Sequence, residues 1–254
     1  MNITEAINQA VLCAKAGEPV LLIGQPGIGK TAVPNAVAKL LGLPYREIRA
    51  AEFESVDFRG VPTVVDGRTV WNLPEFWPSE ACVLNFDEIS QAPPELTSPL
   101  LKIFLGRSLG NYTLPTGTVL FATANDVADR AGCSRISSAL RERCVIIRIE
   151  ADATDWLAWY RSQATTNDDV VAYIEQHRTD LHCWDAKKDF NQPTPRNWER
   201  MGRVAARTMN VETLAGIVGP EYAAKFAAFV IANVRIPAVS EVLAGVATDR
   251  KSVV

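Results

Sequence analysis

The segment Gly24–Thr31 constrains this chain more than any other part of its sequence. It reads Gly-Gln-Pro-Gly-Ile-Gly-Lys-Thr and satisfies every fixed position of the phosphate-loop pattern G-x-x-x-x-G-K-[S/T]. The apolar run Pro19–Ile23 precedes it and predicts a buried strand, while Ala32–Leu41 predicts a helix. A strand, a glycine-rich loop and a helix in this order bring backbone N–H groups and a helix N-terminus around a phosphate.

The loop therefore predicts a site for the phosphates of a nucleotide. We expect Lys30 to reach the β- and γ-phosphates and the Thr31 hydroxyl to bind Mg²⁺. The flanking strand and helix disfavour the alternative, a chance glycine turn. The residues expected to surround the nucleotide are Gly24, Gln25, Pro26, Gly27, Ile28, Gly29, Lys30, Thr31 and Ala32.

Length and composition fit an ordinary globular protein. With 254 residues, 48% of them hydrophobic, the chain can build one sizeable domain and a smaller one. The net charge of -3 provides no global basic field that would attract nucleic acid. The five cysteines lack close paired spacing, which predicts reduced thiols rather than a zinc site or disulfides. No signal peptide or run of ~20 apolar residues is visible, so we expect a cytoplasmic protein without a membrane span.

Short apolar segments alternate with helical patterns up to about residue 150. This alternation predicts an α/β fold with a parallel sheet flanked by helices on both faces. Together with the phosphate loop, it indicates the sheet of a P-loop NTPase. A first helix is expected over Thr4–Ala16. The expected strands are Val20–Ile23, Tyr45–Arg49, Cys82–Phe86, Val119–Ala124 and Val145–Ile149.

Two segments interrupt the alternation and predict β-hairpins. In Val61–Trp71, the pair Asp66-Gly67 lies between two β-prone runs, which is a strong hairpin signal. A weaker hairpin is expected over residues 109–120, around Pro115–Gly117. Of the aromatic residues in or after the first hairpin, Trp71, Phe76 and Trp77, we expect at least two to belong to the core.

After Glu150 the strand patterns stop and helical patterns take over. We predict a nucleotide-binding core domain over residues 1–152 and a small C-terminal helical lid domain over residues 153–254. Thr194 is the expected N-cap of a helix with Pro195 at its first position, and both histidines are expected to be surface or packing residues. The predicted helices are Asp155–Gln163, Asp168–His177, Pro195–Met209 and Pro220–Val234, the last with a core stripe of Phe226, Phe229, Val230 and Val234.

The segment Val83–Glu88 is a mostly apolar strand that ends in two carboxylates. At the carboxyl edge of an α/β sheet, these acids point into the ligand crevice. Asp87 suits a role in holding hydrated Mg²⁺, and Glu88 suits the activation of water for attack on the γ-phosphate. Asn85 is a polar residue within the same strand and requires hydrogen-bond partners if it is buried.

The phosphate loop, the Asp87-Glu88 pair, the later strand ending in Ala122–Asn125 and the helical C-terminal region together resemble AAA+ ATPases. Within them, the chain is similar to the MoxR group, which carries an extra hairpin between its second and third core strands. The Val61–Trp71 hairpin lies at that point, and Asp57–Gly60 before it resembles the acidic, glycine-ending lead-in of that group.

The resemblance implies roles for further residues. Asn125 matches the sensor-1 residue that helps to position the attacking water. The segment 138–143 resembles the part that offers an arginine finger to a neighbouring subunit, with Arg143 as the better match and Arg141 as the alternative. Thr194-Pro195-Arg196 resembles the sensor-2 motif, in which an arginine contacts the nucleotide phosphate; Arg196 is that arginine here.

The resemblance implies an ATPase that uses ATP and Mg²⁺, works as a ring, most typically a hexamer, and remodels a protein client. Relatives often act with a partner that contains a von Willebrand factor A domain. One alternative is an AAA+ motor that acts on nucleic acid, but the hairpin region offers only Arg59 and Arg68 among several acids. Another alternative is a nucleotide-gated adaptor with little turnover, which Glu88 argues against.

Overall fold

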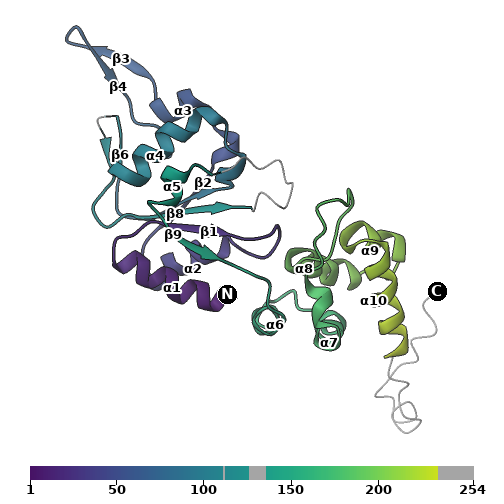
Figure 1. The fold of residues 1–254 in the computed structure, drawn as a ribbon. Coiled ribbons are helices and arrows are strands. Elements are labelled where there is room, and N and C mark those ends of the chain that lie inside the picture. The colour runs from purple at the N-terminus through teal and green to yellow at the C-terminus, as the bar shows by residue number, and fades with distance from the viewer. Residues whose placement is uncertain (111, 126–135, 234–254) are drawn as a thin grey trace.

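The computed structural model describes residues 1–110, 112–125 and 136–233 (Figure 1). A five-stranded parallel sheet lies at the centre of the N-terminal part, and a set of helices follows it in the chain. This is the P-loop NTPase fold with a C-terminal helical region that the alternation of strand and helix patterns predicts.

All five predicted core strands are present and pair in parallel in the order β2-β5-β8-β1-β9. Strands β1, β5 and β8 are central and almost wholly buried, which explains their continuous apolar sequences. Strand β5 begins and ends one residue later than predicted, and β9 ends one residue earlier. The strands are β1 Val20–Ile23, β2 Tyr45–Arg49, β5 Val83–Asp87, β8 Val119–Ala124 and β9 Val145–Arg148.

Helices cover both faces of this sheet (Figure 1). Helices α1 (Ile3–Lys15) and α2 (Ala32–Leu41) pack on one face around Val20, Leu22 and Phe121. Helix α4 (Thr97–Gly106) packs on the other face with Leu84, Phe86 and Leu120. The shorter helices of this part are α3 Ser55–Arg59, α5 Ser138–Arg141, η1 Ala50–Glu52, η2 Ile89–Gln91 and η3 Pro94–Leu96.

The first predicted hairpin is confirmed. Strands β3 (Pro62–Val65) and β4 (Arg68–Trp71) pair antiparallel, and both turn residues have positive φ, 48° at Asp66 and 71° at Gly67. This is the conformation that an Asp-Gly turn favours. Phe76 and Trp77 pack into the core after the hairpin, whereas Trp71 is 39% exposed, so two of the three aromatic residues are core as expected.

The second predicted hairpin is misplaced. The structure pairs β6 (Ser108–Leu109) with β7 (Tyr112–Thr113), before the Pro115–Gly117 segment rather than around it. Gly110, with φ at 58°, supplies the reversal between the two strands. Pro115 begins a separate turn, closed by the Thr118 N–H donating to the Pro115 carbonyl at 3.1 Å.

The C-terminal helical region has a buried cluster of its own, which includes Tyr160, Tyr173 and Trp198. Phe226 belongs to this cluster, with Phe229 and Val230 packed against it. The fourth residue of the predicted stripe, Val234, lies outside the described residues. The domain boundary at residue 152 stays a prediction. The helices are α6 Ala153–Arg161, α7 Asp168–Gln176, η5 Arg178–Leu181, α8 Pro195–Ala205, α9 Val211–Val218 and α10 Pro220–Ala232.

Helix α8 ends four residues earlier than predicted, and α9 follows it as a separate helix. Thr194 caps α8 by accepting a 3.2 Å hydrogen bond from the Asn197 N–H, which confirms the predicted cap. The His177 ring packs against Tyr173 at 4.7 Å, as expected for a packing residue. Within the described ranges, no helix is long and apolar enough to cross a membrane.

Candidate functional site

The loop between β1 and α2 has a backbone that only glycine permits at several positions. A Cβ atom on Gly24 would lie 2.6 Å from the Ile149 carbonyl oxygen, so a side chain there would displace the loop from the sheet. Gly27 and Gly29 have φ values of 74° and 96°, in the region that glycine adopts readily. The glycines of the motif thus fix the path of the loop around its expected ligand.

Lys30 connects this loop to the end of strand β8. Its Nζ donates hydrogen bonds to the carbonyls of Gly24 at 2.8 Å and Gln25 at 2.9 Å, and to Asn125 Oδ1 at 2.7 Å. Asn125 is 8% exposed, and its own N–H donates to the Ser90 hydroxyl at 3.4 Å. The lysine of the motif and the predicted sensor-1 residue therefore lie in direct contact.

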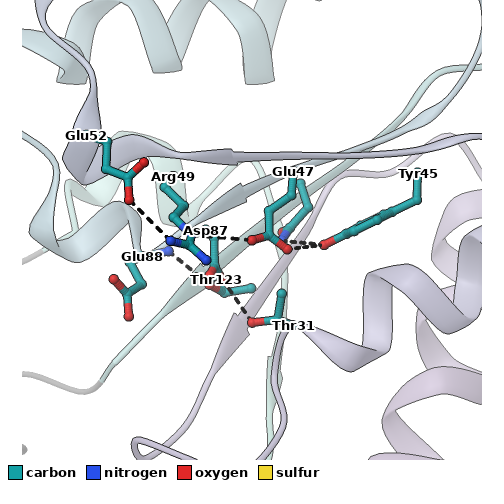
Figure 2. Close-up of polar contacts among 9 residues, drawn as sticks. Thr31, Tyr45, Glu47, Arg49, Glu52, Asp87, Glu88 and Thr123 are labelled. Atoms are coloured by element: carbon teal, nitrogen blue, oxygen red, sulfur yellow. Dashed lines mark hydrogen bonds and ion pairs between the residues drawn. The ribbon is translucent and has the colours of Figure 1, made fainter. Parts of the chain in front are cut away.

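Asp87 lies beside Thr31 at the carboxyl end of β5 (Figure 2). The Thr31 hydroxyl donates to Asp87 Oδ1 at 3.3 Å, and the Thr123 hydroxyl donates to the same oxygen. One carboxylate and one hydroxyl next to a phosphate loop form a donor set that fits hydrated Mg²⁺, which prefers oxygen ligands and few carboxylates. The described residues contain no cluster of three or more His, Cys, Asp or Glu residues for a metal.

Glu88 follows Asp87 in a strained backbone conformation. Its φ is 54°, in the left-handed region that non-glycine residues rarely adopt. The Glu88 N–H donates to the Thr123 hydroxyl oxygen at 3.0 Å, and the Glu88 side chain is exposed to the cavity. Strain of this kind is maintained where the surroundings fix the residue, and it concentrates at functional sites.

Thr123 is a site residue that the sequence did not indicate. Its hydroxyl donates to the Asp87 carboxylate and accepts from the Glu88 N–H, so one buried side chain holds the first acid and the backbone of the second. The pairing of Phe86 with Ala122 in the sheet places Thr123 next to Asp87. The register between β5 and β8 is the signal that could have identified Thr123. A strand register becomes known only with the fold.

These side chains line one cavity, together with Arg196 from the helical region. Of the predicted nucleotide-binding residues, Gly24, Gln25, Ile28 and Ala32 do not line it; Ile28 instead packs in the core at 4% exposure. The lining residues are Pro26, Gly27, Gly29, Lys30, Thr31, Asp87, Glu88, Thr123, Ala124, Asn125 and Arg196.

Residues before and at the start of helix α8 contact the phosphate loop directly. The Arg196 N–H donates to the Gly27 carbonyl at 3.1 Å, and a Cβ atom on Gly27 would lie 2.7 Å from the Thr194 hydroxyl. Gly27 is thus required both for its φ and for this close approach. The contact holds the Arg196 guanidinium, which is exposed, at the edge of the cavity.

Arg141 and Arg143 lie away from this cavity. They immediately precede β9, whose first residue, Val145, donates to the Pro19 carbonyl at 2.8 Å at the amino end of β1. The phosphate loop follows the carboxyl end of β1, so the two arginines lie toward the opposite end of the strands from it. Arg141 is exposed, whereas Arg143 Nη1 donates to the Ala139 carbonyl at 2.9 Å. Neither arginine belongs to the cavity of its own chain.

The buried Asn85 begins a chain of polar contacts that continues along strand β2, where Figure 2 shows Tyr45, Glu47 and Arg49. Asn85 Nδ2 donates to the Tyr45 hydroxyl at 3.3 Å, and this hydroxyl donates to Glu47 at 2.8 Å. Burial and the hydrogen bond to Glu47 raise the pKa of Tyr45, so the phenol stays protonated. Arg49 then pairs with Glu47 at 3.7 Å and with Glu52 at 3.3 Å.

The cysteines are free thiols in the described part of the chain, as predicted. Burial raises the pKa of the Cys144 thiol to about 12, and it also raises the pKa of Cys13 and Cys82. A thiol must ionise to act as a nucleophile or metal ligand. Cys82 belongs to the core on one face of the sheet, Cys144 packs against the same core, and Cys13 packs against the core on the other face. Cys133 lies outside the described residues.

Comparison with known proteins agrees with this geometry. Residues 19–144 match the family model described as the AAA domain, dynein-related subfamily. This segment contains the phosphate loop, both carboxylates and Asn125. Residues 19–144 therefore form an AAA domain, the nucleotide-binding module of AAA+ ATPases. A search of curated proteins finds no match to the chain.

Solved structures share the fold at low sequence identity. NtrX from Brucella abortus in complex with ADP is 15% identical, with a TM-score of 0.54 over 96% of this chain and 57% of that one. The RuvB P216G mutant from Thermotoga maritima is 17% identical, with a TM-score of 0.54 over 88% of this chain and 68% of that one. A protein of Cytophaga hutchinsonii ATCC 33406 is 21% identical, with a TM-score of 0.50, and this chain spans 58% of its length.

Proposed function

Starting from the AAA domain of residues 19–144, we propose that this chain is a Mg²⁺-dependent ATPase of the MoxR type that acts as a ring-forming remodelling machine. One observation carries the ATPase part. Five polar side chains with distinct chemical roles converge on one cavity: Lys30, Thr31, Asp87, Glu88 and Asn125. They come from three separate segments of the chain, and only the fold brings them together.

Each of these groups suits one part of phosphoryl transfer to water. Lys30 and the loop N–H groups would hold the β- and γ-phosphates, and Thr31 and Asp87 would hold Mg²⁺, which neutralises phosphate charge when bound. Glu88 has an exposed carboxylate and suits orientation and deprotonation of the attacking water. Asn125 would position the same water, and Arg196 would contact a phosphate from the side of α8.

The test of the ATPase is phosphate release from ATP with Mg²⁺ and after its removal by EDTA. Turnover should require the metal, stop in Lys30→Ala with loss of nucleotide binding, and become very slow in Glu88→Gln with binding retained. Tight ATP binding by Lys30→Ala would contradict the phosphate site. A Glu88→Gln rate equal to that of the wild type would remove Glu88 from the chemistry.

The location of Arg143 supports a ring. A cation at the opposite end of the strands from its own cavity can reach a γ-phosphate only in another subunit, and repeated head-to-tail contacts close into a ring. The test is the mass of the Glu88→Gln protein by light scattering, with and without ATP·Mg²⁺. A ring-sized assembly with ATP would support shared sites; a monomer with bound ATP would favour a nucleotide-gated adaptor.

The exposed β3–β4 hairpin supports a protein client. Its apolar residues include Val61 at 68%, Val64 at 73% and Trp71 at 39% exposure, and an isolated two-stranded hairpin buries little of its own surface. Such a surface suits contact with polypeptide. A partner with a von Willebrand factor A domain rests on the MoxR resemblance alone, and a pull-down with the ATP-trapped ring tests it.

A further inference from the structure

Helix α8 carries four arginines on one side: Arg196, Arg200, Arg203 and Arg207. At about 100° per residue, they fall within an arc of about 60°, opposite the buried Trp198 and Met201. The first three lie on the helix, and Arg207 lies in the turn that continues it, its N–H donating to the Val204 carbonyl at 2.9 Å. All four side chains are exposed. We call this set the arginine stripe.

The fold of the helical region does not require the arginine stripe. Like charges three or four residues apart destabilise a helix, and a cation near the helix N-terminus is also unfavourable. Internal neighbours offset little of this cost: Arg203 pairs with Glu199, and Arg200 donates to Asn197 Oδ1 at 3.4 Å. Among the described residues, the guanidinium groups of Arg196 and Arg207 have no such partner. The arrangement therefore points to an anionic surface outside this chain.

The stripe begins at the edge of the nucleotide cavity. Arg196 lines the cavity, and its N–H holds the Gly27 carbonyl. From there the other three arginines extend away over about 16 Å, at about 1.5 Å per helical residue. Any protein that covers the cavity from this side would therefore also meet Arg200, Arg203 and Arg207.

In the proposed ring, the surface around Arg143 of a neighbouring copy covers the cavity. That surface is the amino edge of the sheet, and it bears the exposed carboxylates Glu18, Glu80 and Glu142. Glu18 lies just before β1, where its N–H donates to the Cys13 carbonyl at 3.0 Å. Glu80 lies three residues before the first residue of β5, Val83, which places it at the same edge of the sheet.

The carboxylates are spread over a distance similar to that of the stripe. The strand order β5-β8-β1-β9 puts the start of β5 three strands from β9, which Arg143 precedes. With strands ~4.8 Å apart, the edge between Arg143 and Glu80 covers about 14 Å. Lys15, Arg46 and Arg141 share this edge with Arg143. The match is therefore one of positions, carboxylate against guanidinium, rather than of net charge.

We propose that the arginine stripe of one copy binds the carboxylates at the amino edge of the next copy, with Glu18 and Glu80 as its main anions. The inference rests on the proposed ring and adds to it a second contact that aligns Arg143 with the cavity. Arginine suits this role because its planar fork binds carboxylates with two parallel hydrogen bonds.

A nucleic-acid backbone is the competing occupant of the stripe. Two observations disfavour it. Glu199 lies at the side of the stripe and would repel phosphates, and the aromatic residue of α8, Trp198, is buried and offers no stacking surface to bases. Competition between the two partners is therefore part of the test.

The experiment uses charge reversal on each side of the contact, in a Glu88→Gln background that retains ATP. One variant is R200E/R207E, which leaves Arg196 and the Arg203–Glu199 pair intact; the other is E18R/E80R. Each alone should raise the protein concentration at which half of the chains assemble by about tenfold or more, with ATP binding unchanged. K187E/K188E, with two exposed lysines of the helical region reversed, should assemble as the parent does.

An equal mixture of the two charge-reversed variants gives the decisive result. In a ring that alternates the two variants, each interface pairs either a wild-type stripe with a wild-type edge or a reversed stripe with a reversed edge. Opposite charges then meet at every interface, so assembly should return to the parent level. Failure of the mixture to assemble would overturn the stripe contact. Unchanged assembly of R200E/R207E would overturn it too, while leaving the ring in place.

Two further outcomes separate this inference from its alternatives. A parent protein that binds ATP and stays monomeric would contradict the proposed ring and the stripe contact together. Salt-sensitive binding of a fluorescein-labelled 30-nucleotide DNA or RNA, lost in R200E/R207E but not in K187E/K188E, would assign the stripe to nucleic acid if assembly is unaffected.

Discussion

Lys30 and Asn125 are joined by a 2.7 Å hydrogen bond between Nζ and Oδ1, although 95 residues separate them in the sequence. The lysine lies in the loop after β1, and the asparagine follows β8, the neighbouring strand in the sheet. The two groups that would face the γ-phosphate are thus positioned against each other by the sheet. Their contact gives Asn125 a defined orientation before any substrate binds.

We predict that Asn125→Ala lowers the rate of ATP turnover by about 10²-fold and changes nucleotide affinity by only a few fold. Removal of one pre-oriented polar group at a reaction centre typically has an effect of this size on the chemical step. Single-turnover hydrolysis and fluorescent-nucleotide titration measure the two quantities. A loss of affinity as large as the loss of rate would assign Asn125 to ground-state binding instead.

Thr123→Val should destabilise the protein by about 1–3 kcal/mol, because it removes a buried hydrogen bond to a carboxylate and one from a backbone N–H. It should also weaken the dependence of ATP binding on Mg²⁺, since Asp87 loses the group that orients it. Urea unfolding and Mg²⁺ titration provide the measurements. Thr123→Ser retains the hydroxyl and serves as the control; equal behaviour of the two variants would mean that the hydroxyl has no such role.

Glu88→Gly should make the fold more stable while it abolishes hydrolysis. A non-glycine residue at φ 54° is strained, and glycine relieves this at some cost in unfolded-state entropy, for a net gain of about 0.5–1 kcal/mol. Glu88→Gln keeps the strain and removes the carboxylate, so it should be inactive without the gain in stability. Thermal unfolding of both variants tests the point, and equal melting temperatures would argue against strain at this residue.

Much of this site could be predicted from sequence because its residues belong to local patterns. The phosphate loop, Asp87 and Glu88 are recognisable from the order of apolar strand, special residues and helix. Thr123 was not predicted because its role depends on the register between β5 and β8, which a linear sequence does not display. The residues contributed by each segment are thus more predictable than the contacts between segments.

The helices and strands show the same contrast between features set by local sequence and features set by tertiary contacts. Helix α9 was not predicted because Val211–Val218 is a short apolar segment, and eight such residues do not distinguish a helix from a strand. The second hairpin was misplaced because Pro115–Gly117 carries a turn signal of its own, whereas the reversal occurs near Gly110. In both cases tertiary packing decides between local alternatives of similar propensity.

The last prediction concerns Arg143, whose position at the amino edge of the sheet excludes it from the cavity of its own chain. Arg143→Ala subunits should bind ATP without hydrolysing it, and Lys30→Ala subunits should neither bind nor hydrolyse it. In an equal mixture, random assembly places an intact Arg143 against an intact phosphate loop at about a quarter of the interfaces, so about a quarter of wild-type activity should return.

Arg141→Ala in place of Arg143→Ala is the matched control. Because Arg143 Nη1 is bound to the Ala139 carbonyl while Arg141 is exposed, rescue in the Arg141 mixture alone would transfer the role to Arg141. No rescue in either mixture, with mixed assembly confirmed by mass, would contradict an arginine supplied by a neighbouring subunit.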